Sequence, residues 1–187
     1  MAKLQLTHAS ILNSSAQLLV LPVNNAGVVL DPVLTRAKTL FPDNYQRYHR
    51  ACRDGSLIVG SCLLHKRTRE QAGLGISSNG NQPSYIANLV ISDHPYHPAR
   101  IRWLTAALVD FQQQMISLIC YQGIRRVALL ARPIIYENPR DAESNKNDGS
   151  NSLPLDWYTE TLPLLIEYLQ DLPNLHIDIH LPKNINL

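Results

Sequence analysis

A strand pattern, a polar loop and a helix pattern follow one another in "AQLLVLPVNNAGVVLDPVLTRAKTLFP", residues 16–42. The continuous apolar run at 16–23 is typical of a strand that is covered on both faces. Pro32 fits the first position of a helix, where a missing N–H costs nothing. Pro42 ends that helix, because proline disfavours helical geometry at the residue before it. This order predicts an α/β fold.

The same alternation continues on both sides of this stretch. The patterns predict further strands at 4–7, 61–66, 85–91, 125–131 and 175–181, and further helices at 43–53, 99–122 and 157–170. No repeat and no linker divides the chain. We therefore predict a three-layer α/β/α sandwich with a central mixed sheet, formed by one domain over residues 1–187 with a long polar insertion at about 132–154.

Two of the helix patterns carry specific expectations. Asp43 is expected to cap the helix at 43–53, whose buried face is predicted at 45, 48, 49 and 52 by helical spacing. The helix at 99–122 has apolar residues at a regular three-four spacing from Ile101 to Leu118. Gly123 is a natural stop for it.

Composition limits the class of protein. The chain has 187 residues, a net charge of +2 and three cysteines without a CxxC spacing, namely Cys52, Cys62 and Cys120. We expect these cysteines to be reduced and mostly buried, in a soluble cytoplasmic protein without a signal peptide or membrane helix. The mild positive charge neither demands nor excludes a nucleic-acid partner. His176, Asp178 and His180 alternate on one strand face, where a half-exposed strand is favoured over a metal site, and no metal or cofactor is expected.

Several motifs, in the right order along the chain, resemble those of one family. They are Val23-Asn24, Gly27, Phe41-Pro42, Tyr45, Tyr48, Ala51-Cys52, Gly55, Gly60, "YIANLVISDHPYHPARI" (85–101) and "LDWYTETLPLLIEYL" (155–169). This set resembles the macrodomains, which bind ADP-ribose. It is similar to the branch that contains the antitoxins removing ADP-ribose from DNA and the terminal ADP-ribose glycohydrolase.

The resemblance implies a set of ligand-binding residues. Asn24 stands where the family contacts the distal ribose, and an amide suits this task because it donates and accepts. The backbone of Asn25, Ala26 and Gly27 is expected to line the ligand, with Gly27 permitting close approach. Further expected contacts are Ser10 and Ile11 on the adenine side, together with Asn88 and His94.

The sequence also departs from the branch at two functional positions. In the branch, the loop after the first buried strand continues Gly-Lys-Gly and contains a catalytic lysine. This chain has Leu30, Asp31 and Pro32 at those positions. Loss of that lysine would remove most of the chemical acceleration. The glycine-rich turn that cradles the diphosphate is replaced by 132–154, in which Gly149 is the only glycine.

Three hypotheses follow. The favoured one is a domain that binds ADP-ribose or a related ADP-ribosyl nucleotide without efficient hydrolysis. The second is a hydrolase of ADP-ribosylated DNA or protein, in which Asp31 is a general base assisted by His94 or Asp156; Asp31 and Asp156 fit equally well as helix N-caps. The third is a scaffold without a ligand, which contacts a protein partner through 132–154.

Overall fold

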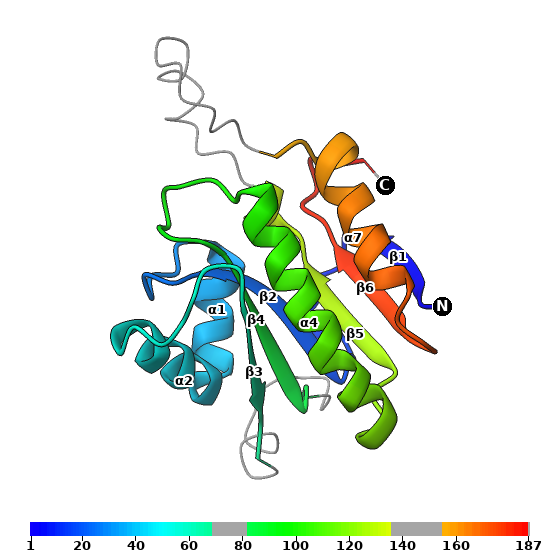
Figure 1. The fold of residues 1–187 in the computed structure, drawn as a ribbon, viewed down its shortest axis with the longest axis horizontal. Coiled ribbons are helices and arrows are strands. Elements are labelled where there is room, and N and C mark those ends of the chain that lie inside the picture. The colour runs from blue at the N-terminus through cyan, green and yellow to red at the C-terminus, as the bar shows by residue number, and fades with distance from the viewer. Residues whose placement is uncertain (69–81, 136–154, 187) are drawn as a thin grey trace.

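The computed structural model of the chain describes residues 1–68, 82–135 and 155–186. A six-stranded sheet lies at its centre in the order β1-β6-β5-β2-β4-β3 (Figure 1). β3 pairs with β4 in antiparallel orientation and every other pairing is parallel, so the sheet is mixed. The strands are β1 (Lys3–Thr7), β2 (Leu18–Asn24), β3 (Cys62–Lys66), β4 (Tyr85–Ser92), β5 (Arg126–Leu130) and β6 (His176–His180).

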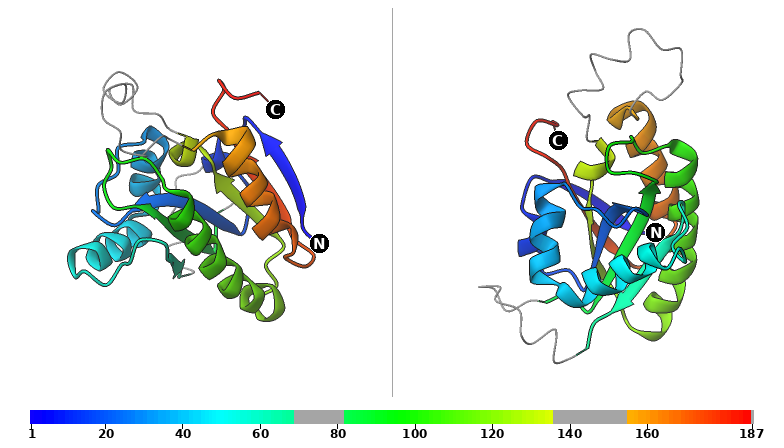
Figure 2. Two further views of the ribbon diagram at one scale, coloured as in Figure 1. Left: turned by 45° about the horizontal axis from the view of Figure 1, so that its top comes forward. Right: turned by 90° about the vertical axis from the view of Figure 1, so that its left-hand side faces the viewer.

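Helices cover both faces of this sheet. α1 (Pro32–Leu40) and α2 (Pro42–Arg53) lie on one face, and α4 (Ile101–Tyr121) and α7 (Leu162–Gln170) lie on the other (Figure 2). Three short elements complete the described chain, namely η1 (Ile11–Asn13), α5 (Arg132–Ile135) and η2 (Trp157–Thr161). The predicted three-layer α/β/α sandwich with a mixed sheet is confirmed.

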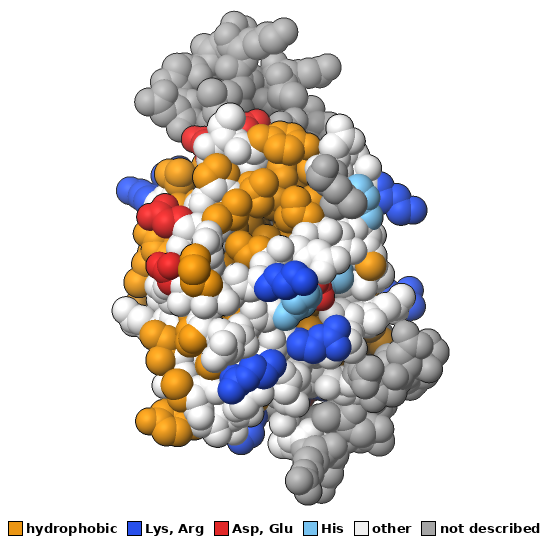
Figure 3. Space-filling view, turned by 90° about the vertical axis from the view of Figure 1, so that its right-hand side faces the viewer, with side chains coloured by type: hydrophobic (Ala, Val, Ile, Leu, Met, Phe, Trp, Pro, Cys, Tyr) orange, Lys and Arg blue, Asp and Glu red, His pale blue; other side chains and the backbone are white. Residues whose placement is uncertain are grey.

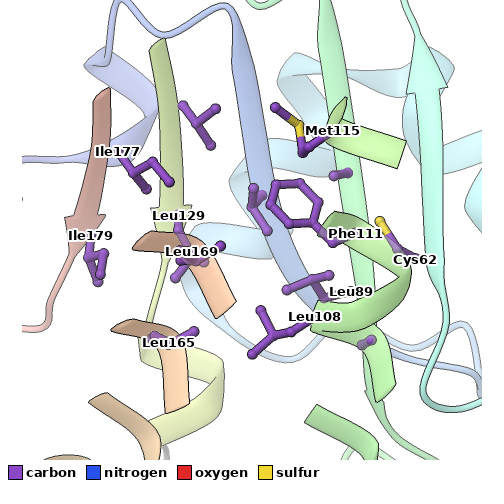
Figure 4. Close-up of a cluster of buried hydrophobic side chains, with 14 of the residues drawn as sticks. Cys62, Leu89, Leu108, Phe111, Met115, Leu129, Leu165, Leu169, Ile177 and Ile179 are labelled. Atoms are coloured by element: carbon purple, nitrogen blue, oxygen red, sulfur yellow. The ribbon is translucent and has the colours of Figure 1, made fainter. Parts of the chain in front are cut away.

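The sheet separates two apolar cores. In the larger one, Phe111 and Met115 of α4 and Leu165 of α7 pack against strand side chains such as Leu89 and Ile177 (Figure 4). The smaller one lies under α1, α2 and η1. All seven residues of β2 are buried, as the continuous apolar run predicts for a strand between two helical layers.

The edge strand β1 leaves part of its apolar surface accessible. Leu4 and Leu6 are only partly buried against the larger core, as is Tyr168 of α7. From this side of the molecule, hydrophobic side chains gather in one area of the surface (Figure 3). No helix among the described residues is long and apolar enough to span a membrane.

α2 differs from the prediction at its first turn. Asp43 is not the cap: the N-cap position is Phe41, which makes no side-chain capping bond, and Asp43 lies one position inside the helix after Pro42. The buried face is also shifted, because Asn44 is buried whereas His49 is exposed. The reason is the partner of Asp43, whose carboxylate turns toward β3 and pairs with His65 and Arg67.

The other elements follow the prediction with small corrections. α4 begins at Ile101, which is exposed, and ends before Gly123, whose φ of +66° is the left-handed conformation expected at such a stop. The last predicted helix begins with the π-helical turn η2 before α7. The thiols are free, but only Cys62 is buried and Cys120 is exposed. Of the predicted insertion, residues 132–135 form α5, and 136–154 lie outside the described residues.

Candidate functional site

The loop after β2 is fixed by the side chain of Asn24. Its Nδ2 donates to the carbonyl of Val28 over 2.7 Å, and its Oδ1 accepts from the backbone N–H of Ala26 over 3.0 Å. The Tyr48 hydroxyl of α2 donates to the backbone carbonyl of Asn24 over 2.7 Å. Asn24 is 8% exposed, so this amide shapes the loop from inside as well as lining its surface.

The backbone of Asn25, Ala26 and Gly27 is less open than the resemblance implies. The N–H of Asn25 donates to the carbonyl of Ser92 over 3.1 Å, and that of Ala26 is taken by Asn24. Gly27 is buried with a φ of +78°, and a Cβ there would stand 3.2 Å from the Cβ of Cys52. Glycine is therefore needed for the turn and for packing on α2. Burial raises the pKa of the Cys52 thiol, which keeps it protonated.

A first cavity of about 280 Å³ opens beside this loop, at the carboxyl ends of β2 and β4. One wall is formed by Asn24 and the chain from Val28 to Pro32, and the other by Ser92 and the segment from Pro95 to Ala99. Crevices at the carboxyl ends of parallel strands are the usual ligand sites of open α/β sheets. Asn24 and Asp31 are the predicted site residues that line it.

A second cavity of about 1080 Å³ lies at the carboxyl ends of β1, β5 and β6. Ser10 and Ile11, which were predicted for the adenine side, line it together with the segment from His180 to Ile185. His180 is 5% exposed, and its Nδ1 lies 2.8 Å from the carbonyl of Ala9. Its Nε2 has no hydrogen-bond partner among the described residues. Burial holds the pKa of His180 below its ordinary value, so the imidazole is neutral.

Asp31, in the wall of the first cavity, forms an ion pair with Arg132, which lines both cavities. Arg132 Nε lies 2.9 Å from Asp31 Oδ2, without the alignment of a hydrogen bond. Asp31 Oδ1 accepts from the N–H groups of Val33 and Leu34, so Asp31 caps α1 as its position before Pro32 predicts. Asp31 Oδ1 is therefore held by the first turn of α1, whereas Oδ2 faces Arg132 in an ion pair.

Asn88 lies in the protein interior, outside both cavities. It is 1% exposed on β4, and its side chain exchanges hydrogen bonds of 3.1 and 2.8 Å with Asn44 of α2. Its Nδ2 also donates to the carbonyl of Leu63 over 3.1 Å. The structure gives Asn88 a role in joining α2, β3 and β4, and its ligand contact stays a prediction.

Two further predicted residues also lie outside the two cavities. Asp156 is exposed and caps η2, accepting from the N–H and hydroxyl of Thr159, each over 2.7 Å. Hydrogen bonds from Thr159 lower the pKa of its carboxyl. His94 is exposed and accepts from the N–H of Tyr96 over 3.2 Å. The structure does not bring either residue to the cavity walls.

Sequence reasoning missed several wall residues of the first cavity, of which Ser92, Tyr96, His97 and Arg132 carry polar groups. Tyr96 and His97 follow β4 and Arg132 follows β5. Position directly after a buried parallel strand was the signal that could have found them. His97 is exposed, and its Nδ1 lies 3.0 Å from a carboxylate oxygen of Asp93. The described residues contain no group of three or more His, Cys, Asp or Glu side chains that could hold a metal ion.

Comparison with known proteins connects this arrangement to one fold. No protein-family model matches the chain. A DNA ADP-ribosyl glycohydrolase from Thermus aquaticus is 30% identical over 130 residues, which cover 70% of this chain and 31% of the relative. The chain thus matches about a third of the length of that curated relative.

Solved structures are similar over nearly the whole chain. The macrodomain of Thermus aquaticus DarG has a TM-score of 0.70 and 25% identity, covering 97% of this chain and 100% of its own. Thermosipho africanus DarTG, solved in complex with ADP-ribose, has a TM-score of 0.70 and 22% identity, covering 99% of this chain and 43% of its own. The resemblance to macrodomains inferred from the sequence is confirmed.

Proposed function

We propose that this chain, which has the macrodomain fold, binds ADP-ribose or a related ADP-ribosyl nucleotide in the cleft formed by the two cavities. The observation that carries the proposal is their arrangement at one edge of the sheet. The larger cavity has Ser10 and Ile11 in its wall, the smaller one has Asn24, and a cation lies between them. ADP-ribose has the same order: adenosine, an anionic diphosphate and a second ribose.

Each half of the ligand has a suitable wall. The smaller cavity offers the second N–H of Asn24 Nδ2, which has no acceptor among the described residues, to a ribose hydroxyl. Apolar side chains from Val28, Val29 and Leu34 line the same space. The larger cavity has room for a nucleoside between η1 and the residues after β6. Concave, largely apolar walls with a few placed polar groups are typical of small-molecule sites.

Binding without efficient hydrolysis fits the state of Asp31. This carboxylate stands where the resembling branch has its lysine; its Oδ1 accepts from two backbone N–H groups and its Oδ2 is paired with the cation of Arg132. It therefore lacks a nucleophilic amine, and it is not placed to accept a proton freely.

Hydrolysis of ADP-ribosylated DNA is the second candidate, because the relative that is 30% identical is named a DNA ADP-ribosyl glycohydrolase. Incubation with ADP-ribosylated oligonucleotide and with ADP-ribosylated protein tests it. Release of ADP-ribose at a rate that falls in Asp31→Ala would favour the hydrolase over the binding domain.

Isothermal titration calorimetry with ADP-ribose tests the binding function directly. We expect micromolar affinity for the wild type and a loss of at least about tenfold in Asn24→Ala, because one ribose contact and the loop shape are removed together. Tyr48→Phe is the matched control, since it removes the hydrogen bond from α2 to the Asn24 carbonyl and keeps the Asn24 amide. Its loss should be smaller.

Absence of heat and of thermal stabilisation at millimolar ADP-ribose would overturn the proposal. A scaffold that contacts a protein through the insertion at 132–154 would then be favoured. Most of that segment lies outside the described residues.

A further inference from the structure

Arg132 is placed differently from the other residues of the cleft. Among the described residues it is the one that lines both cavities. It stands at the first position of α5, two residues after β5 ends at Leu130. This side chain therefore lies beside both cavities.

The charges of the two walls single out the same residue. Lys183 and Arg132 are the only Lys or Arg side chains among the described wall residues, and Lys183 lies in the larger cavity alone. The Arg132 side chain is 39% exposed, whereas that of Asp31 is 9% exposed. The cation is therefore accessible from the cleft, and its counter-ion is largely covered.

The guanidinium has unused donors. Its Nε faces Asp31 Oδ2 over 2.9 Å, and its two Nη groups have no partner within the described ranges. Arginine presents its N–H groups as a fork that matches two oxygens of a phosphate. The free side of this fork can thus meet an anion while the ion pair with Asp31 holds its place.

We infer that Arg132 binds the diphosphate of the ligand, with Asp31 as the counter-ion that positions the guanidinium and competes with the phosphates for it. This inference rests on the proposed function and deepens it by assigning the anionic part of the ligand to one side chain. A side-chain cation here does the work for which a glycine-rich turn would supply backbone N–H groups. It explains how a chain with a single glycine in 132–154 retains a diphosphate site.

Calorimetry on wild type, Arg132→Gln, Asp31→Asn and the double variant tests the inference, with ADP-ribose and phosphate-free adenosine as ligands. Arg132→Gln should weaken ADP-ribose binding about 10- to 100-fold, because a charge-assisted phosphate contact is lost. Its affinity for adenosine, which has no phosphate, should fall far less. Arg132→Lys should fall between, since it keeps the charge and loses the fork.

Asp31→Asn should keep α1 capped, because the amide oxygen can accept from the same N–H groups. It should bind ADP-ribose severalfold more tightly, and this gain should vanish in the double variant. An unchanged melting temperature for each variant ensures that the comparison is between folded proteins.

The outcomes separate the two proposals. Wild-type protein that does not bind ADP-ribose overturns the proposed function and this inference with it. Wild-type binding together with an Arg132→Gln affinity within twofold of it overturns the inference alone. An Arg132→Gln variant that loses as much affinity for adenosine as for ADP-ribose also overturns the inference alone. An Asp31→Asn variant that binds ADP-ribose no better than wild type overturns the competing role of the carboxylate.

Discussion

The Tyr48 hydroxyl donates to the backbone carbonyl of Asn24 over 2.7 Å, which ties α2 to the loop at the end of β2. Tyr48→Phe removes this donor and leaves the Cys52 thiol at 3.9 Å from the same carbonyl. We expect the free energy of unfolding to fall by about 1–2 kcal/mol, as measured by urea denaturation. Tyr121→Phe is the control, because Tyr121 is 83% exposed. Equal stability of both variants would contradict the prediction.

Asn88→Ala should change stability and spare binding. The substitution leaves the Asn44 side chain and the carbonyl of Leu63 without their buried partner. The unfolding free energy should fall by about 2 kcal/mol, whereas the ADP-ribose affinity of the folded protein should stay at the wild-type value in calorimetry. A selective loss of affinity would return Asn88 to the ligand site.

Asp43 should carry a large part of the stability of the α2–β3 contact. Its side chain is 5% exposed and lies 2.8 Å from His65 Nε2 and 3.1 Å from Arg67 Nε. Asp43→Asn should lower the unfolding free energy by about 3 kcal/mol, because it breaks a buried ion pair. Asp54→Asn is the matched control, since its partner Arg53 is exposed, and it should leave denaturation unchanged.

The lowered pKa of Asp43 predicts that the protein loses stability in acid. Burial opposes ionisation of Asp43, but hydrogen bonds from Arg67 and His65 outweigh it and hold the pKa below the ordinary 3.8. The contribution of the carboxylate is therefore complete above about pH 4 and is lost as the pH falls through the lower folded value. Wild-type protein should lose stability below pH 4 more steeply than Asp43→Asn. Parallel curves would refute this.

His180 predicts a change in stability nearer to neutral pH. Burial lowers its pKa below 6.5 in the folded protein, despite the Ala9 carbonyl and Asp178. Between these two values the unfolded chain binds a proton that the folded chain does not, so stability falls as the pH drops below about 6.5. His180→Gln keeps a donor for the Ala9 carbonyl. In this variant the free energy of unfolding, measured by urea denaturation, should depend less on pH between about pH 7 and pH 5. His49→Gln, at an exposed position, should leave the slope as it is.

Much of the fold was predictable because the burial of a strand or helix face determines the local pattern of apolar residues. The apolar run of β2, the spacing in α4 and the stop at Gly123 each reflect one element and its immediate neighbours. Asp43 escaped prediction for the opposite reason. An acidic residue after a proline reads as a cap, and only the approach of β3 decides that its carboxylate meets Arg67 instead.

Single residues of the candidate site could be predicted from the sequence, whereas contacts between distant residues could not. The resemblance implies ligand contacts for Asn24 and Ser10, and each lines a cavity in the structure, while the contacts themselves stay predictions. The position of Asn88 between α2 and β3 was not predictable, because an asparagine in a strand carries no sign of the side toward which it points. The pairing of Asp31 with Arg132 joins residues about a hundred positions apart, and local patterns do not encode such a distance.

The cleft lies at the carboxyl end of β4, and the charged cluster around Asp43 lies near the opposite end of that strand. β4 shows this, because its first residue, Tyr85, pairs with Lys66 next to His65 and its last, Ser92, lines the smaller cavity. Amino-acid changes can therefore accumulate around the cleft without weakening the ion pairs that hold α2 to β3.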